Sequence, residues 1–313
     1  MLDEVHQDLD RAQGDKNIYT LGRIGKHNVV MACLPSGTTG ISPAAKVATD
    51  MLRSFPRIRF GLMVGIGGGA PSPNKLPSED IRLGDVVVSI PDGELGKNVI
   101  GCCWKYLDSQ KVAGGVVKYD RGKVVAGGEF EHTGLLNMPP ALLTNAVAKL
   151  RGKHEFKRSA VSRYVSEMVK KMLESEDVNP DFEDMYQYQG SKYDQLFEAD
   201  YEHVNSEQIS NTFNEGQDTS GKVPDDHKLP CPNCDEARLV ARKPRKRNDP
   251  VIHYGTIASA DLVMRHGTTR EKLRKKYGIL CFEMEAAGLM NDFPCLVIRG
   301  ICDYSDTHKH KIW

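Results

Sequence analysis

The chain has 313 residues, which is enough for one large α/β domain or two modest ones. Its 42 Lys and Arg balance 42 Asp and Glu, so no overall field attracts nucleic acid or an anionic membrane surface. No stretch approaches the ~20 consecutive apolar residues that a membrane-spanning helix needs.

Two further features indicate the compartment. Residues 1–15 are polar and acidic, so we expect no signal peptide. Half of the eight cysteines lie inside apolar runs, which is typical of reduced core residues: Cys33, Cys281, Cys295 and Cys302. We therefore expect a cytoplasmic protein.

The first part of the chain predicts a hairpin followed by a helix. Residues 17–22 and 29–34 are β-compatible and are joined by a short turn. Ser42 and Pro43 suit a helix start, and apolar residues follow at helical spacing to about Phe55.

Buried strands are expected next, at residues 60–66 and 84–90. Residues 115–119 and 124–130 are expected to form a further pair. The strands are rich in Val and Ile with little alternation, which indicates a sheet covered on both faces.

The middle of the chain predicts helices at residues 140–150 and 161–173. Residues 174–249 then lose periodicity and become polar. A structureless loop of that length is improbable inside a compact core, so we expect a surface insertion that is partly mobile. Order returns with a strand at 253–259 and a helix at 261–277 that breaks at Gly267.

The last stretch, residues 280–303, predicts a short strand, a helix of about two turns and a second apolar strand. Glu283 and Glu285 open the helix, while Arg299 and Asp303 fall near the end of the second strand. Acidic side chains also suit a helix start for purely electrostatic reasons. Ligands of open α/β sheets nevertheless bind at the carboxyl ends of strands, so this stretch is the preferred site.

Residues 65–70, GIGGGA, follow a strand and superficially fit a dinucleotide-binding fingerprint. That fingerprint needs a helix within the motif, whereas Pro71 follows here, so a dinucleotide oxidoreductase is disfavoured. Backbone N–H groups at Gly67 and Gly68 could instead approach an anion or a sugar. The alternative is a tight turn that needs positive φ.

Two polar motifs are not assigned a function. Cys231 and Cys234 have zinc-knuckle spacing and His227 lies nearby, but four ligands are not evident, so we predict no metal and no cofactor. The basic run 238–247 is typical of a solvated face or a localisation patch. A role in holding substrate phosphates remains an alternative.

Four segments, in this order, resemble the nucleoside phosphorylase superfamily, in the version found in fungal multidomain proteins with NACHT or ankyrin modules. The segments are MVGIGGG with DIRLGDVVVS (glycine loop and following strand), HYGTIASAD (with Ala260 for a family Gly), FEMEAAGL (ribose-binding turn) and CLVIRGICD (catalytic strand). The resemblance to purine nucleoside phosphorylases and methylthioadenosine nucleosidases covers most of the chain outside the insertion.

The resemblance implies an α/β fold with three α/β/α layers and a mixed central sheet. The domain would span residues 17–313, with residues 174–249 as a long polar insertion within it. The family's first strand and final helix have no counterpart, so the chain resembles a domain truncated at both ends.

The implied activity is cleavage of the N-glycosidic bond of a purine nucleoside or nucleotide. Asp303 matches the aspartate that protonates purine N7 as a general acid. Glu285 matches the carboxylate that binds the ribose hydroxyls, Met284 lies under the sugar, and Val263 aligns with a base-stacking Phe. Glu283 is expected beside the substrate.

Hydrolysis is favoured over phosphorolysis. Phosphate-holding Arg and Ser positions of the phosphorylases align with Met63 and Ile66 here. Arg299 matches an Arg near the attacking water of the nucleosidases, although their water-activating Glu has no counterpart. The alternatives are a purine nucleoside phosphorylase and a catalytically impaired nucleoside-sensing or interaction module.

The expected ligand is thus a purine nucleoside or nucleotide, with phosphate as an open second ligand. We expect a homo-oligomer, and no nucleic-acid or membrane partner. The identity of the purine, acceptance of a 5′-phosphate chain and the oligomer size stay open.

Overall fold

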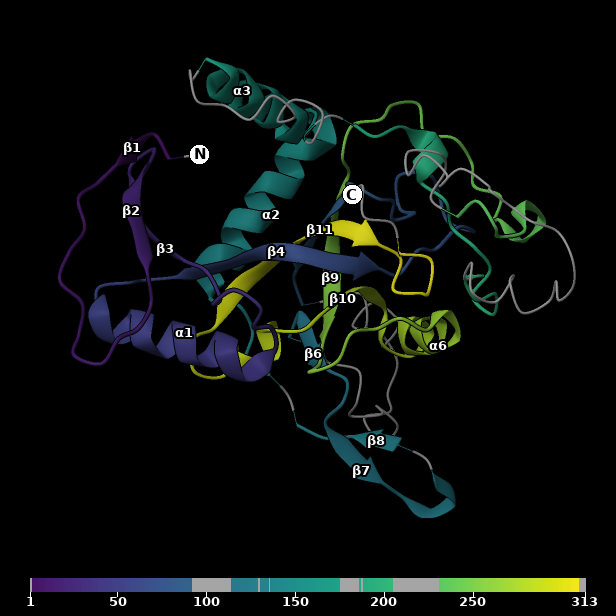
Figure 1. Cartoon of the computed structure of the whole chain (residues 1–313), viewed down its shortest axis with the longest axis horizontal. Coiled ribbons are helices and arrows are strands. Elements are labelled where there is room, and N and C mark those ends of the chain that lie inside the picture. Colours follow the sequence, from purple (N-terminus) through teal and green to yellow (C-terminus); the bar gives the residue numbers. More distant parts are fainter. Residues whose placement is uncertain are drawn as a thin grey trace, which may run out of the picture.

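The computed structural model describes residues 2–91, 114–128, 130–134, 136–174, 186, 188–204 and 231–309. The predicted insertion, residues 174–249, is therefore described only in part, and its proposed limits stay a prediction. A mixed sheet lies at the centre, with helices on both sides of it (Figure 1). The expected three-layer α/β architecture is confirmed.

The strands of the central sheet are β4 (Gly61–Gly69), β5 (Val86–Ser89), β6 (Val116–Lys118), β9 (Ile252–Ser259), β10 (Ile279–Glu283) and β11 (Cys295–Asp303). Two smaller sheets contain β1 (Glu4–Val5), β2 (Tyr19–Ile24) and β3 (His27–Ala32), and β7 (Gly122–Val124) with β8 (Phe130–His132). The principal helices are α1 (Ile41–Ser54), α2 (Ala141–Phe156), α3 (Val161–Leu173) and α6 (Gly267–Tyr277). None of the helices in the described ranges has the length and apolar character to cross a membrane.

The central sheet curls back on itself. Its strands follow the order β10, β4, β11, β5, β9 and β6, and β9 also pairs with β10. The pairings therefore close a ring of β10, β4, β11, β5 and β9. Most of these pairs are parallel, whereas β10–β4 and β11–β5 are antiparallel. Closure brings the carboxyl ends of β10 and β11 next to the glycine-rich end of β4.

Alternating side chains of β11 show that this strand is covered on both faces. Val297 is buried in the cluster that includes Ala44 and Ala48 of α1. Leu296, the preceding residue, packs with Leu143 and Val147 of α2. Successive strand residues point to opposite faces, so the apolar run of this strand serves two helical layers. Figure 1 shows α2 on one side of the strands and α1 and α6 on the other. Leu62, Val64 and Ile66 of β4 are exposed, so the buried strand expected at residues 60–66 is covered on one face only.

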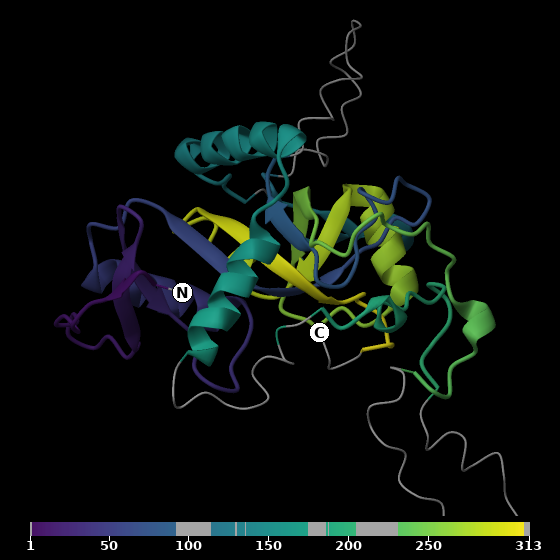
Figure 2. The same ribbon diagram turned by 90° about the horizontal axis from the view of Figure 1, so that it is seen from above.

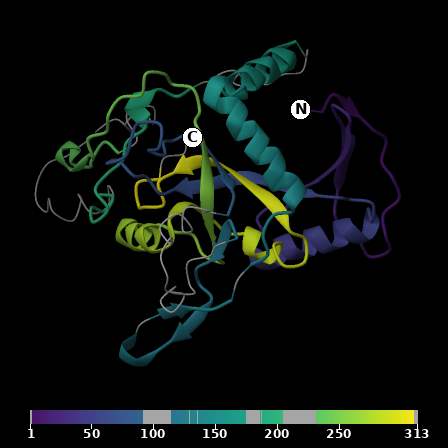
Figure 3. The same ribbon diagram turned by 180° about the vertical axis from the view of Figure 1, so that it is seen from behind.

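The remaining elements lie around this core. The β1–β2–β3 sheet is at one end of the molecule, and α6 and the described part of the insertion are at the opposite end (Figure 2). The β7–β8 hairpin projects away from the central sheet, as the view from behind also shows (Figure 3).

Two sequence expectations about strands and helices are wrong. Residues 115–119 do not pair with 124–130, because β6 joins β9 in the central sheet while β7 pairs with β8. The helix expected from residue 261 begins only at Gly267. A side chain there would overlap the carbonyl of Ala199, and His266 before it is extended, so the packed insertion fixes the helix start.

The predicted two-turn helix after Glu283 is also wrong, because the structure has a single 3-10 turn, Ala286–Gly288. The Glu283 carboxylate accepts hydrogen bonds from the N–H groups of Glu285 and Ala286. Gly288 lies directly against the carbonyl of Ile41 at the start of α1. Side-chain capping and close packing therefore stop the helix after one turn.

The basic run 238–247 is more than a solvated face, because the side chains of Arg242 and Arg245 are only 7% and 12% exposed. Arg245 donates to both oxygens of Asp85, at 2.7 and 2.5 Å. Arg242 donates to Asp80 at 2.8 Å and pairs with Asp194 at 3.3 Å. Burial of these cations is tolerated because each has a carboxylate partner, and the pairs attach the insertion to the segment before β5.

Asp85 is the most heavily bonded of these carboxylates. It is 1% exposed and also accepts the N–H groups of Arg82 and Val251, at 2.8 and 2.9 Å, while His253 Nε2 lies 2.9 Å away. Burial alone would raise the pKa of Asp85, but hydrogen bonds and charge from Arg245 and His253 hold it below its usual 3.8.

We predict that Asp85→Asn lowers the free energy of unfolding by about 3–5 kcal/mol at neutral pH, since it leaves Arg245 buried without a charged partner. The lowered pKa means that the carboxylate stabilises the fold above its unfolded-state value. This contribution is lost as the pH falls below about 3.8. Urea titrations of both proteins between pH 7 and pH 3 measure the difference, which should shrink toward acid. A gap independent of pH would contradict the assignment.

Candidate functional site

The predicted site is organised around Arg299 of β11. Arg299 is 3% exposed, and its Nη2 donates to Glu283 Oε2 and lies 3.4 Å from Glu285 Oε2. One guanidinium thus links Glu283, the last residue of β10, with Glu285, which follows that strand. The cluster carries two negative charges and one positive charge in a region largely removed from water.

The glycines of β4 make room for this arginine. A side chain at Gly65 would overlap Arg299 Nη1, and a Cβ at Gly67 would lie 3.4 Å from Arg299 Cβ and 2.9 Å from Phe282 O. Neither glycine has positive φ, and both lie inside a strand paired with β11. The tight turn considered as an alternative is therefore wrong, because close approach of neighbouring groups is what these glycines permit.

Asp303 is the last residue of β11. Its Oδ1 accepts the Ser305 N–H at 2.8 Å, and its Oδ2 pairs with Lys309 Nζ at 2.9 Å. A Cβ at Gly68 would lie 2.6 Å from Asp303 Oδ1 and would also overlap Ser305 Oγ. Ser305 adopts the left-handed region at φ 54°, which turns the chain back over the carboxylate.

The two glutamates have different environments. The Glu283 side chain is buried and is occupied by Arg299 and by two backbone N–H groups, so its position is that of an anchor for the turn. The Glu285 side chain is 14% exposed and accepts the Gly40 N–H at 3.3 Å. Glu285 is therefore the carboxylate of the pair with more access for a ligand.

Met284 and Val263 are the remaining candidates. Met284 lies between the two glutamates and is partly buried. Val263 is 50% exposed in the segment between β9 and α6, whereas its neighbour Met264 is buried against Ala70 and Phe282. The structure brings Glu283, Glu285, Arg299 and Gly67 together at this end of the sheet, with Val263 at its surface. Asp303 contacts Gly68, and successive residues of a strand face opposite sides, so its carboxylate lies on the other face of β4 from Arg299.

Cys302 adjoins the candidate acid. Its Sγ lies 3.5 Å from Asp303 Oδ2 and 3.7 Å from the carbonyl of Gly67. Burial, together with the nearby Asp303 charge, raises the pKa of the Cys302 thiol to about 12. Cys302 is therefore a neutral packing and hydrogen-bonding group at neutral pH, and not a nucleophile.

Sequence reasoning missed three contributors to the cluster: Gly40, Ser305 and Lys309. Gly40 has φ 101°, which favours glycine, and its N–H reaches Glu285 across a large sequence separation. Lys309 and Ser305 follow Asp303 with no motif spacing that would single them out. Only the positive φ of Gly40, before a helix start, has a sequence signal.

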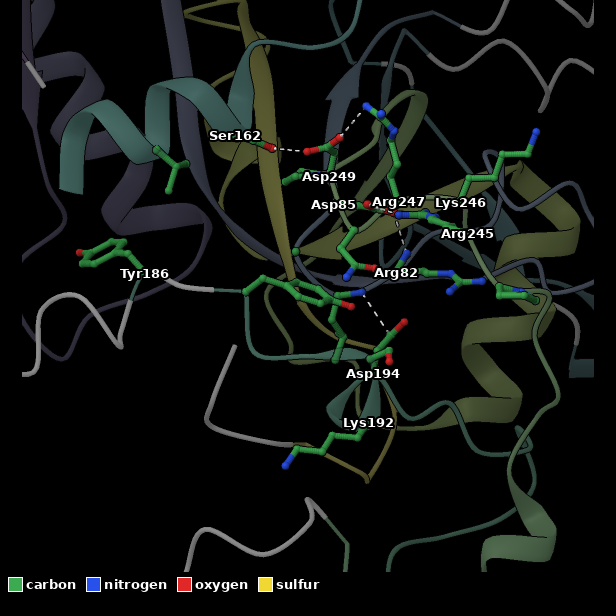
Figure 4. Close-up of a pocket in the computed structure, with 18 of the residues that line it drawn as sticks. Arg82, Asp85, Ser162, Tyr186, Lys192, Asp194, Arg245, Lys246, Arg247 and Asp249 are labelled. Atoms are coloured by element: carbon green, nitrogen blue, oxygen red, sulfur yellow. Dashed lines mark hydrogen bonds and ion pairs between the residues drawn. The ribbon is translucent and has the colours of Figure 1, made fainter. Parts of the chain in front are cut away.

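A large groove lies at a different place. It has a volume of about 1840 Å³ and lies between α3, the segment before β5 and the insertion (Figure 4). Its lining is rich in charged groups, including Arg82, Asp85, Lys192, Asp194, Arg245 and Asp249. Many of these charged groups already have partners within the protein: Asp85 pairs with Arg245, and Asp249 accepts a hydrogen bond from Ser162 Oγ at 3.0 Å. Because Glu285 and Asp303 do not line it, we assign the site to the carboxylate cluster at the strand ends.

The chain is similar to several known proteins. Residues 198–312 match the phosphorylase superfamily. A nucleotide-binding leucine-rich repeat (NLR)-like protein of Hyaloscypha variabilis is 39% identical over the whole chain. The chain spans 26% of the length of that relative. The expected resemblance to the superfamily is confirmed.

Solved structures with a loose overall likeness include two Helicobacter pylori proteins. One is futalosine hydrolase, with TM-score 0.43 and 13% identity; the matched region covers 96% of this chain and 77% of the hydrolase chain. The other is a mutant methylthioadenosine nucleosidase with 5′-methylthioadenosine in its active site, with TM-score 0.45, 12% identity and coverage of 95% and 77%. At these values neither carries an argument about substrate.

The packing at β4 predicts different costs for two glycine substitutions. Gly68→Ala should lower the free energy of unfolding by about 1–3 kcal/mol, because its methyl group meets Asp303 and Ser305. Gly300→Ala, in the adjacent strand, meets nothing within 4 Å and should cost less than about 1 kcal/mol. Urea unfolding of the two variants measures the difference, and equal costs would contradict the close approach.

Proposed function

We propose that this chain, which matches the phosphorylase superfamily over residues 198–312, hydrolyses the N-glycosidic bond of a purine nucleoside or nucleotide. The observation that carries the proposal is the arrangement at the sheet end. Arg299 fixes Glu285 on the Gly65–Gly67 face of β4, and Asp303 reaches the same end of that strand on its Gly68 face.

This arrangement suits the charge that develops during the reaction. Breaking the bond leaves positive charge on the ribose and negative charge on the departing base. Glu283 and Glu285 outnumber Arg299 in charge, so the ribose side of the site retains a negative excess that stabilises the positive sugar. Glu285 would accept hydrogen bonds from the ribose hydroxyls, and Asp303 would donate a proton to purine N7 as a general acid.

Arg299 acts in this proposal chiefly as a positioning residue. Its guanidinium is buried and shared by two carboxylates, so it orients Glu285. For the same reason it is a poor additional ligand for phosphate. Met63 and Ile66, which align with phosphate-holding positions of phosphorylases, supply no polar group. These features favour water over phosphate as the nucleophile.

A specific contact favours a second candidate function, nucleoside binding without turnover. Lys309 occupies Asp303 Oδ2 at 2.9 Å, and the Ser305 N–H occupies Oδ1 at 2.8 Å. A purine that needs a proton from Asp303 must displace Lys309. If this displacement does not occur, the site would hold the sugar through Glu285 and release no base.

Free adenine measured after incubation with adenosine or ATP separates these functions. Release in phosphate-free buffer supports hydrolysis, and release only with phosphate identifies a phosphorylase. Binding of adenosine by calorimetry without adenine release identifies a sensing module. Neither binding nor release of either compound would contradict the proposed site.

We predict that Asp303→Asn lowers the rate of base release about 10²–10⁴-fold, since the amide has no proton to transfer as an acid. Glu285→Gln should reduce kcat/KM about 10–100-fold, because hydrogen bonds from the ribose to a charged acceptor are weakened. Steady-state kinetics on the 313-residue chain measure both effects. Asp292→Asn, at an exposed position on the loop before β11, is the matched control and should leave rates unchanged.

A further inference from the structure

Three side chains that are distant in sequence converge beside the end of β11. Ligand atoms of His203, Cys231 and Cys234 all lie within 4.8 Å of one another. Cys234 Sγ and His203 Nδ1 are 3.3 Å apart. This is near the roughly 3.6 Å that separates a sulfur and a nitrogen bound to one tetrahedral zinc ion, given bonds of about 2.3 and 2.0–2.1 Å.

The backbone around the cysteines forms a knuckle. The Cys234 N–H donates to the Cys231 carbonyl at 3.1 Å, which closes the turn and points both side chains the same way. The Val204 N–H donates to Cys234 Sγ at 3.5 Å. Both cysteines are buried in an apolar cluster with Phe197 and are free of disulfides.

His308 is a fourth candidate ligand, whose ring nitrogens lie outside the 4.8 Å group of the other three donors and would have to turn toward it. Its side chain is 2% exposed, and neither ring nitrogen makes a hydrogen bond within the described ranges. The ring stacks on Phe197 at 4.1 Å between centroids and meets His203 edge-on at 5.6 Å. Nδ1 lies 3.7 Å from Asp306 Oδ1, beyond hydrogen-bond distance. Asp306 is thus a long-range ion-pair partner for Nδ1, whereas Nε2 is buried without a hydrogen bond, which is costly unless a further group satisfies it.

We propose that His203, Cys231, Cys234 and His308 bind a structural zinc ion. Two sulfur and two nitrogen donors suit zinc and exclude the hard cations Mg²⁺ and Ca²⁺, which prefer oxygen. On binding, the two thiols release their protons to solvent and the charge of Zn²⁺ is balanced by two thiolates. All four donors come from the protein, so the site is closed and structural, with no position left for a reacting water.

The site ties the insertion to the segment that carries the candidate acid. His203 and the cysteines belong to the insertion, whereas His308 follows Asp303 and precedes Lys309. A hydrogen bond also joins the insertion to the segment after β11, because the His203 N–H donates to Thr307 Oγ1 at 2.8 Å. Figures 1 and 3 agree that the described insertion lies at the end of the molecule toward which β11 runs.

The earlier expectation of no metal rested on ligands close to the cysteines in sequence. His227, the candidate considered then, lies outside the described residues. The histidines that the fold brings to the cysteines, His203 and His308, are far from them in the chain. Sequence spacing therefore gave no sign of the complete set, and only the packing of the insertion against the end of β11 assembles it.

Metal analysis of the untagged, reduced 313-residue chain tests the proposal. Elemental analysis should find about one zinc ion per chain, and cobalt added to the metal-free protein should give the absorption of a tetrahedral thiolate complex. Removal of zinc should lower the thermal midpoint, and its return should restore it. Absence of zinc together with no cobalt spectrum would overturn the proposal, as would a Cys231–Cys234 disulfide in freshly purified protein.

Variants assign the ligands. Cys231→Ser and His308→Ala should each weaken zinc affinity by more than the roughly 10–100-fold lost with an outer-sphere partner. Cys33→Ser and His27→Ala, at exposed positions elsewhere, should retain full affinity. Unchanged affinity in His308→Ala would remove that residue from the set and refute the four-ligand site. If a variant does not fold, the cobalt titration of the unaltered chain decides.

Discussion

The buried pairing of Arg299 with Glu283 is the constraint on which the rest of the site depends. A guanidinium removed from water needs a carboxylate partner, and here the partner is Glu283, the last residue of β10. Space for the arginine exists only because β4 carries glycine at Gly65 and Gly67. The same guanidinium then reaches Glu285, which is more accessible. Structural anchoring and ligand positioning are thus performed by one side chain.

Closure of the sheet explains how residues from separate segments meet. The β9–β10 pairing turns an open mixed sheet into a ring, so β10 and β11 both end beside the glycine-rich part of β4. In a flat sheet with this strand order, the carboxyl ends would spread along an edge. The ring gathers them, and the antiparallel β10–β4 contact places Phe282 directly opposite Gly68.

Much of this could be predicted from the sequence, and the failures have physical causes. Strong apolar runs located β4, β5, β9, β10 and β11, and helical spacing located α1 and α3, because burial dictates periodicity. Local patterns missed the pairing of β6 with β9 and the start of α6, since both depend on contacts with distant segments. The strand-end rule selected Glu285, Arg299 and Asp303 for the candidate site, although Arg299 lies in the middle of β11 and not near its end. It gave no indication of Lys309 or of the role of Arg245 in burying Asp85.

The segment after β11 connects these observations. Asp303 is held by Ser305, which itself adopts the left-handed conformation, and by Lys309, which directly follows the buried His308. Asp306 adds a buried ion pair with Arg270 of α6, so this short segment is fixed at several points. A ligand that competes with Lys309 for Asp303 must therefore move one side chain and not the backbone. The Lys309 side chain is flexible and partly exposed, so it can leave Asp303 without disturbing the contacts of Ser305 and Asp306 that fix the backbone. Access of a ligand to Asp303 is therefore compatible with a rigid strand end.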